Sequence, residues 1–112
     1  MAYEVEILSP AYDFIQTLDI KMRAKTLSTI ELLKQFGPFL TKPHVKKLKS
    51  IKNLCELRVK QSSNICRLFF FHYQDTIYVI TSGYIKKDRK TSKNEIQKAE
   101  KIMTQFLEDK NE

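Results

Sequence analysis

The sequence predicts an α+β fold with the element order β-α-α-β-β-β-α, in which an N-terminal helical hairpin and a C-terminal helix cover a small, mostly antiparallel sheet. Three observations predict this fold. The chain opens with a short alternating stretch, two segments with helical spacing of apolar residues follow, and three β-rich runs stand in succession before a last helical segment. The 112 residues suffice for one domain, spanning 1–112.

The first third of the chain is typical of a strand followed by two helices. The stretch "YEVEIL" alternates apolar residues with glutamates, as a half-buried strand does. Ser9 and Pro10 then supply an N-cap and a proline at the first helical position. Asp19 can cap a second helix, which Gly37 and Pro38 are expected to end. The apolar side of this second helix is predicted to be Met22, Leu27, Ile30, Leu33 and Phe36.

The second half of the chain predicts three strands and a helix. The polar turn "QSSN" joins "LCELRVK" to "ICRLFFFHY" as an antiparallel hairpin that places Arg58 opposite Arg67, although an odd-length loop would shift this register. Cys55 then lies opposite Phe70, too far from Cys66 for a disulfide. Both faces of "RLFFFHY" are largely apolar, which predicts the central strand. After the third strand, "TIYVITSGYI", the stretch "SKNE" is a capping box that opens the last helix. The apolar face of that helix is predicted to be Ile96, Ala99, Ile102, Met103, Phe106 and Leu107.

Charge is unevenly distributed along the chain. The formal net charge is +7, yet the first 20 residues hold four acidic residues and no basic one. Residues 42–60 hold seven basic residues against Glu56 alone, and residues 38–53 are expected to be irregular and basic. Segregated charge of this kind favours a basic face with an anionic partner, although a surface that serves only solubility would give the same totals.

Several classes of protein are excluded by what the sequence does not contain. Apolar runs fall short of the ~20 residues that cross a bilayer, and the N-terminus is unlike a signal peptide, so we expect a cytoplasmic protein without a membrane partner. The two cysteines fit reduced thiols, and with His44 and His72 they have no zinc-site spacing. Gly37 and Gly83 are too few for a phosphate-binding loop. We therefore expect neither a metal nor a cofactor.

The segment between the last strand and the last helix is strongly basic. Lys86, Lys87, Arg89 and Lys90 fall within five residues, and Asp88 alone offsets them. Cations so close together repel one another unless an anion lies among them, which points to phosphate.

The predicted cross-strand pair of Arg58 and Arg67 points the same way. Like charges directly opposite one another destabilise a sheet by roughly 0.2–1 kcal/mol. A phosphate would offset this cost, because the planar guanidinium can grip it through two hydrogen bonds. The alternative is that each arginine reaches a carboxylate, such as Glu56 or Glu95. His72 has no nearby carboxylate to orient it and is left out of the chemistry.

These residues also resemble a known pattern. "LCELR", "CRLFFF" and "IYVITSGYIKKDRKTSKNEIQKAEKIM" look like the signature of RelE/HigB-type toxins, particularly the phage-derived HigB-like subfamily. That signature runs L-x-E-L-R, then R-x-F-F, then an apolar strand ending in G-F-x-K-K, then K-T-P-x-x-E-I-x-x-A, and the resemblance spans about residues 54–103. Ser82 stands where relatives often have histidine, Tyr84 replaces phenylalanine and Ser92 replaces proline. A histidine-dependent mechanism is therefore not implied.

The resemblance implies a RelE-like fold and the toxin of a type II toxin–antitoxin system. Such a toxin acts in the ribosomal A site as a ribosome-dependent mRNA endoribonuclease and uses the 2′-hydroxyl of the substrate as the nucleophile. The implied partners are a helix-turn-helix antitoxin, the ribosome and mRNA, with DNA bound only through the antitoxin complex. Carried over by position, the signature implicates Arg58, Arg67, Lys86 and Lys87.

The expected chemistry divides among a few side chains. Arg58, Arg67 and Lys86 would stabilise the phosphorane, and either Lys86, crowded by other cations, or Tyr84 would transfer protons. The expected contacts to the RNA backbone come from Lys46, Lys47, Lys49, Lys60, Lys87, Arg89 and Lys90. The alternative is a non-catalytic, basic nucleic-acid-binding or co-repressor module of the same fold. It would have the same electrostatics but would need no proton donor.

Overall fold

A single mixed sheet organises the molecule, and the computed structural model describes residues 2–87 and 92–111. The elements are β1 (Glu4–Ile7), α1 (Ser9–Gln16), α2 (Ile20–Phe36), the 3-10 helix η1 (Gly37–Phe39), β2 (Val45–Lys47), β3 (Leu54–Gln61), β4 (Asn64–Gln74), β5 (Ile77–Ile85) and α3 (Lys93–Lys110). The strand order across the sheet is β1-β5-β4-β3-β2. The β1–β5 pair is parallel and the other pairs are antiparallel, which confirms the predicted α+β fold.

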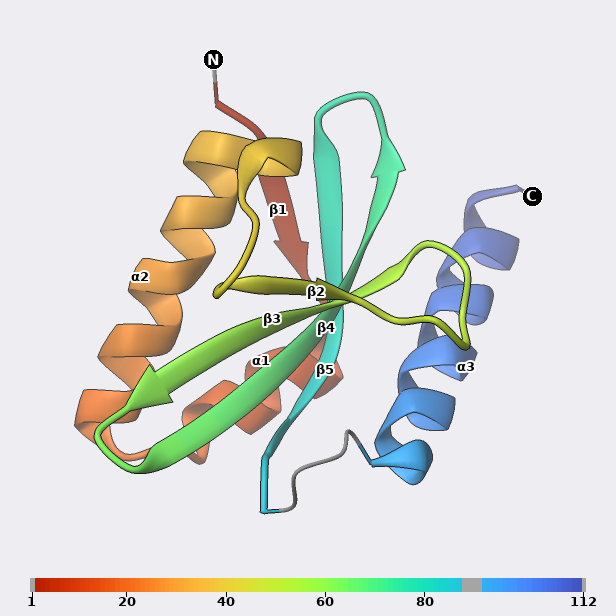
Figure 1. Ribbon diagram of the computed structural model, residues 1–112. Helices are drawn as coiled ribbons and strands as arrows, with labels where there is room; N and C mark the ends of the chain where they lie inside the picture. The colour runs from red at the N-terminus through yellow and green to blue at the C-terminus, as the bar shows by residue number, and fades with distance from the viewer. Residues whose placement is uncertain (1, 88–91, 112) are drawn as a thin grey trace.

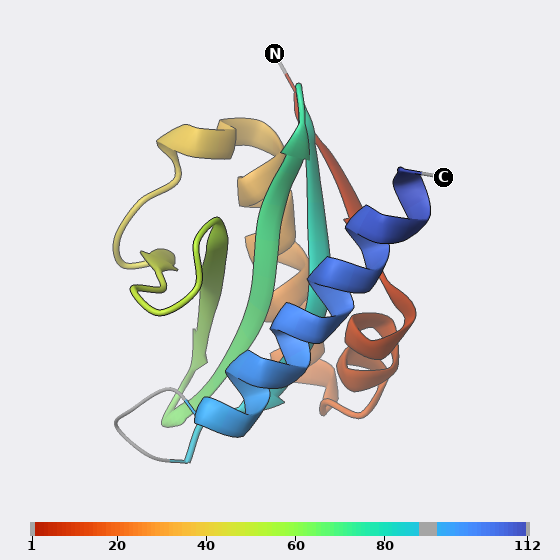
Figure 2. The same cartoon turned by 90° about the vertical axis from the view of Figure 1, so that its right-hand side faces the viewer.

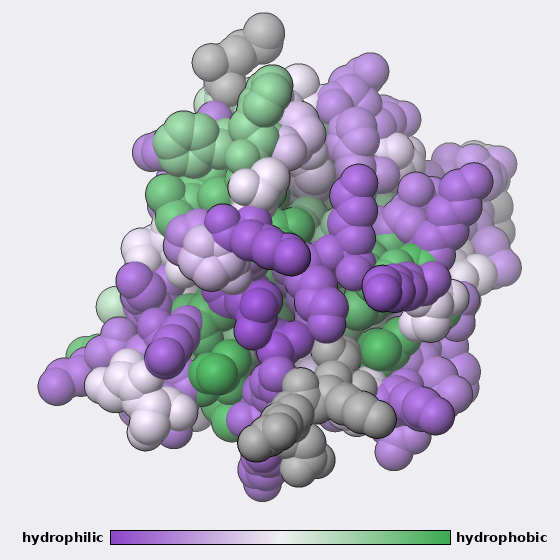
Figure 3. All heavy atoms as spheres, viewed as in Figure 1, coloured by the Kyte–Doolittle hydropathy of each residue, from purple (hydrophilic) through white to green (hydrophobic). Residues whose placement is uncertain are grey.

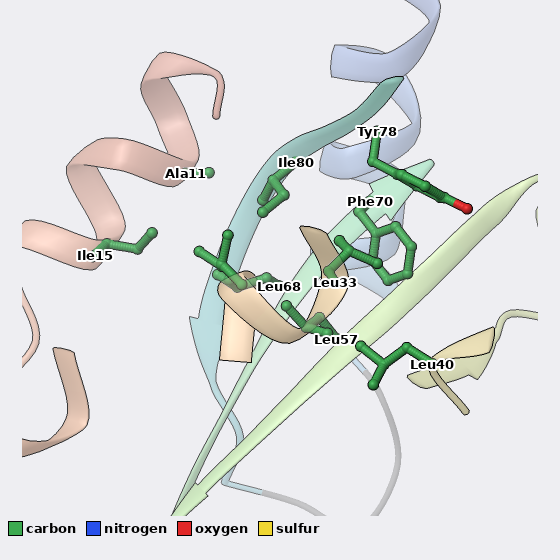
Figure 4. Close-up of a cluster of buried hydrophobic side chains, with 10 residues drawn as sticks. Ala11, Ile15, Leu33, Leu40, Leu57, Leu68, Phe70, Tyr78 and Ile80 are labelled. Atoms are coloured by element: carbon green, nitrogen blue, oxygen red, sulfur yellow. The ribbon is translucent and has the colours of Figure 1, made fainter. Parts of the chain in front are cut away.

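Helices cover both faces of the sheet. Figures 1 and 2 show α1 and α2 on one face and α3 crossing the other. The apolar cluster under α1 and α2 is drawn in Figure 4 and includes Ala11, Ile15, Leu33, Leu57, Leu68, Phe70 and Ile80. Under α3, a second cluster joins Phe69 and Phe71 of β4 to Ala99, Met103 and Phe106. Because β4 contributes to both clusters and has a neighbour on each side, it is the central strand, as predicted.

One strand was not expected from the sequence. Residues 45–47 form β2 within the segment predicted to be irregular, and β2 pairs with β3 at an edge of the sheet. Three residues with two adjacent lysines give little strand signal. Short, lysine-rich edge strands are, however, a common way of preventing unwanted pairing with other chains.

The helix ends follow most of the predicted signals. Asp19 caps α2 by accepting a hydrogen bond from the Met22 N–H at 2.8 Å, and Ser92 caps α3 in the same way. Ser9 was wrongly predicted as the N-cap of α1, because the helix already begins at Ser9 and Leu8 occupies the cap. Pro10 therefore occupies the second helical position and not the first.

The apolar stripe of α2 also differs from the predicted one. Leu27 and Phe36 are exposed, at 46% and 47%, whereas Thr26 and Thr29 are buried. Each threonine hydroxyl donates to a backbone oxygen four residues earlier at 2.8 Å, so its burial leaves no unsatisfied donor. Helical spacing of apolar residues alone could not reveal this rotation of the buried face.

The β3–β4 hairpin has the predicted register. Arg58 lies opposite Arg67 and Cys55 lies opposite Phe70, and both cysteines are free thiols. Gly83 leaves room for side chains from β4 and α1, because a Cβ there would lie 2.5 Å from the Leu68 side chain and 2.7 Å from the Phe14 side chain. Pairing between β4 and β5 places the last residues of β5 beside β4.

Candidate active site

Three adjacent strands bring the main predicted site residues to one face of the sheet. Arg58 of β3 lies opposite Arg67 of β4, and Arg67 in turn lies opposite Tyr84 of β5. Lys86 follows Tyr84 by two residues, and its N–H donates to the Ile65 carbonyl at 2.8 Å. Because side chains alternate between the faces of a sheet, Lys86 lies on the same face as Tyr84.

The charges on this face act on Lys86. Burial lowers the pKa of Lys86, and the positive charges of Arg67, Arg58 and Lys46 lower it further, while Glu56 opposes them. Lys46 of β2 lies opposite Glu56 and therefore shares this face. We call Lys46, Glu56, Arg58, Arg67 and Lys86 the basic cluster. The side chains of the basic cluster thus come from four parts of the chain, between residues 46 and 86, and lie on one face of the sheet.

Arg67 is tied down inside this cluster by a carboxylate. Its Nη1 donates to Glu56 Oε1 at 2.6 Å, and the two side chains are 2% and 0% exposed. The carboxylate alternative left open by the sequence therefore holds for Arg67. Its buried guanidinium is a fixed positive charge beneath the surface, whereas Arg58 and Lys86 are only partly buried and reach solvent.

Glu56 is the site residue that sequence reasoning missed. From the sequence alone, Glu56 is only a possible partner for an arginine. The signal was present in "ELR", because Glu56 and Arg58 are two residues apart on one strand face and Arg67 lies diagonally across from Glu56. The buried bond to Glu56 fixes the position of the Arg67 guanidinium. Removing one partner of such a buried ion pair is strongly destabilising, because the other charge stays buried.

Tyr84 links the basic cluster to the start of α3. Its ring stacks on Phe69, with centroids 5.7 Å apart and an interplanar angle of 13°. Its hydroxyl accepts a hydrogen bond from the Ser92 N–H at 3.3 Å. A tyrosine hydroxyl can both accept and donate, and this hydrogen bond uses its accepting oxygen.

The predicted RNA-contacting lysines fall into separate groups. Lys60 is exposed and lies two residues beyond Arg58, on the same face, and Lys87 is exposed just beyond Lys86. Lys47 lies opposite Cys55 and so occupies the other face, where its charge acts on the Cys55 thiol. Lys49 lies beyond the end of β2.

The structure does not bring Lys47 to the basic cluster, because neighbouring strand residues point to opposite faces. Lys49 is not among the charges that act on Lys86. Arg89 and Lys90 lie outside the described residues.

Two further features of the described residues bear on function. Within 2–87 and 92–111, no group of three or more His, Cys, Asp and Glu side chains could hold a metal ion. Over the same ranges, no helix has both the length and the apolar character needed to span a bilayer.

The family of the chain follows from its match to a family model. Residues 13–104 match the model described as "Phage derived protein Gp49-like (DUF891)". The chain belongs to the Gp49-like family. No curated protein sequence matches this Gp49-like chain.

Solved structures show that the Gp49-like chain has the RelE fold. A double mutant of the E. coli toxin RelE in the free state is 17% identical, with a TM-score of 0.64, and the match covers 90% of this chain and 97% of that one. The archaeal RelE–RelB complex from Pyrococcus horikoshii OT3 gives 19% identity, a TM-score of 0.54 and coverage of 76% and 96%. The predicted RelE-like architecture is therefore confirmed.

Proposed function

We propose that this Gp49-like protein is the toxin of a toxin–antitoxin pair and acts in the cytoplasm as a ribosome-dependent mRNA endoribonuclease. The RelE fold and the Gp49-like family support this function. The observation that carries it is the meeting of Arg58, Arg67 and Lys86 on one sheet face, beside Tyr84. By analogy with the RelE–RelB complex, its partner is an antitoxin, which we expect to be a helix-turn-helix protein.

In the proposed reaction, the 2′-oxygen of the substrate attacks the adjacent phosphorus. The P–O2′ bond forms, the P–O5′ bond breaks, and the products are a 2′,3′-cyclic phosphate and a free 5′-hydroxyl. A base takes the 2′ proton, and an acid gives a proton to the departing 5′-oxygen. The extra negative charge on the phosphorane is the part of the transition state that preorganised cations stabilise.

The side chains of the basic cluster divide these tasks between them. Arg58 and Lys86 reach solvent and can touch the phosphate oxygens. Arg67 is a positioning residue, because its buried positive charge lies beneath the site and lowers the pKa of Lys86. A lysine with a lowered pKa gives up its proton more readily, so Lys86 is our proton donor to the 5′-oxygen, with Tyr84 as the second candidate. Lys46, Lys60 and Lys87 would contact the RNA backbone.

Expression in a bacterium tests the proposal directly. The wild-type chain should arrest growth, and primer extension on mRNA from these cells should show new 5′ ends within translated regions. The double variant Arg58→Ala/Lys86→Ala should lose both effects. The matched control Lys25→Ala/Lys98→Ala removes two exposed lysines elsewhere and should keep both effects.

Two outcomes would contradict the proposal. New 5′ ends that persist in the Arg58→Ala/Lys86→Ala variant would mean that the reaction occurs elsewhere. RNA binding without any new 5′ ends would instead favour a non-catalytic nucleic-acid-binding module.

A further inference from the structure

A second surface of interest lies at the β2 edge of the sheet, mainly on the face opposite the basic cluster. The segment from η1 to β2 arches away from the sheet (Figure 2), and a cavity of about 930 Å³ lies between this segment and the strands. Its floor is formed by Cys55, Phe70 and Tyr78, and Leu40 and Val45 contribute to its wall. We call this cavity the β2 groove.

The β2 groove combines an apolar interior with a basic rim. Four of the described residues that line it are lysines, namely Lys42, Lys46, Lys47 and Lys49, and none of those lining residues is acidic. Burial raises the pKa of the Cys55 thiol, as expected for a poorly hydrated interior, and Lys47 opposes that rise. An occupant must therefore offer apolar groups to the interior and negative charge to the rim.

Exposed aromatic side chains extend the apolar surface beside the groove. Phe36 and Phe39 flank the lining residues Gly37 and Pro38, and they are 47% and 79% exposed. In Figure 3, apolar surface gathers over η1 at the upper left, next to hydrophilic side chains. Large apolar surface rimmed by polar residues is typical of a protein-binding site.

The interior suits aliphatic side chains better than nucleotide bases. Phe70 and Tyr78 are 3% and 6% exposed, and their rings pack edge to face with centroids 5.9 Å apart. They offer no open ring face, which is what a base needs for stacking. We propose that the β2 groove docks an acidic segment of the antitoxin, whose aliphatic side chains enter the groove while its carboxylates pair with the rim lysines. This inference rests on the proposed function for the identity of the partner.

Lys46 connects this docking surface to the basic cluster. It lines the groove, and its charge also acts on Lys86 across the edge strand. Carboxylates placed at Lys46 would weaken the positive field of the basic cluster. The docked partner therefore acts on the reaction site without having to fill it.

Charge reversal at the rim gives the first test. The variant Thr41→Glu/Lys42→Glu changes two exposed groove residues, and the matched control Lys98→Glu/Thr104→Glu makes the same charge change on α3, on the other face. Both are expected to arrest growth as the wild type does. The probe is the protein encoded by the gene adjacent to that of this chain, co-expressed with each variant and purified for binding measurements.

The groove variant should bind this partner at least about tenfold more weakly and escape its rescue, because like charges across an interface disfavour association. The α3 control should remain rescued. Equal rescue of both variants, or equal loss of both, would overturn the groove assignment while leaving toxicity, and so the proposed function, intact. If the wild type does not arrest growth, the proposed function fails, and the binding measurement still decides whether the groove holds the partner.

Thiol labelling gives a second, independent test. Cys55 is half-buried in the groove, whereas Cys66 is 0% exposed and serves as an internal standard. With the partner at a concentration well above its Kd, little of the protein is left unbound. Maleimide labelling of Cys55 in the native complex should therefore slow by about tenfold or more. A short single-stranded RNA should not slow labelling. Protection by the RNA, or no protection by a partner that binds, would overturn the inference.

Discussion

The two ends of the sheet face under α3 are built from the same strands but contain opposite kinds of side chain. At one end, Leu54 of β3 and Phe71 of β4 lie opposite each other and pack under Met103. At the other end, the same two strands place Arg58 opposite Arg67. One end is held by apolar packing, and the other holds like charges together.

This difference shows how the charged end can exist at all. Like charges on adjacent strands oppose pairing, so the neighbouring apolar end and the Glu56–Arg67 pair must offset this cost. Stability and chemistry are thereby assigned to different ends of one pair of strands. Substitutions at the two ends should separate the two properties.

The largest expected effect is the loss of the buried carboxylate. Glu56→Gln removes the buried negative charge that pairs with Arg67, so the free energy of unfolding should fall by about 3–5 kcal/mol. Urea unfolding measures this. Glu31→Gln breaks an exposed pair with Lys34 and should change stability by no more than about 1 kcal/mol. If both variants unfold at the same urea concentration, the buried pair does not hold the charged end together.

The second effect separates activity from stability at the charged end. Arg58→Ala should lower mRNA cleavage by about 10²–10³-fold, as expected for removing one preorganised donor from a developing oxyanion. Stability should not fall, because the substitution also removes a repulsion with Arg67. Cleavage by single-turnover kinetics and unfolding by urea should therefore respond differently. A destabilised Arg58→Ala variant would show that the arginine is structural.

The apolar end should respond in the opposite way. Met103→Ala removes a side chain that is 8% exposed and packs on the β4 phenylalanines, so the free energy of unfolding should fall by at least about 2 kcal/mol. Cleavage measured well below the melting temperature should stay close to that of the wild type. A variant that stays stable but loses cleavage would show that α3 contributes directly to the chemistry.

The charged end was only partly predictable from the sequence, and the reason is physical. The register of Arg58 and Arg67 followed from the turn length, because pairing in a hairpin is a local property. The role of Glu56 did not follow, because whether an arginine binds an anion or a carboxylate depends on burial, and burial is set by distant elements. For the same reason, the sequence placed Lys47 with the basic cluster, whereas the unpredicted strand β2 turns it to the other face.

The smallest effect tests the electrostatic coupling within the basic cluster. If protonated Lys86 donates to the 5′-oxygen, cleavage should fall as the pH rises through its pKa, which lies below the usual lysine value because of burial and neighbouring cations. Lys46→Gln removes one of these cations, so the pKa of Lys86 should rise and the basic limb of the pH–rate profile should move to higher pH. Lys98→Gln, on α3, removes a lysine that is not among the charges acting on Lys86 and should leave the profile in place. A basic limb that moves to lower pH in Lys46→Gln would contradict Lys86 as the acid. Loss of a neighbouring positive charge stabilises the protonated form of Lys86 and so raises its pKa.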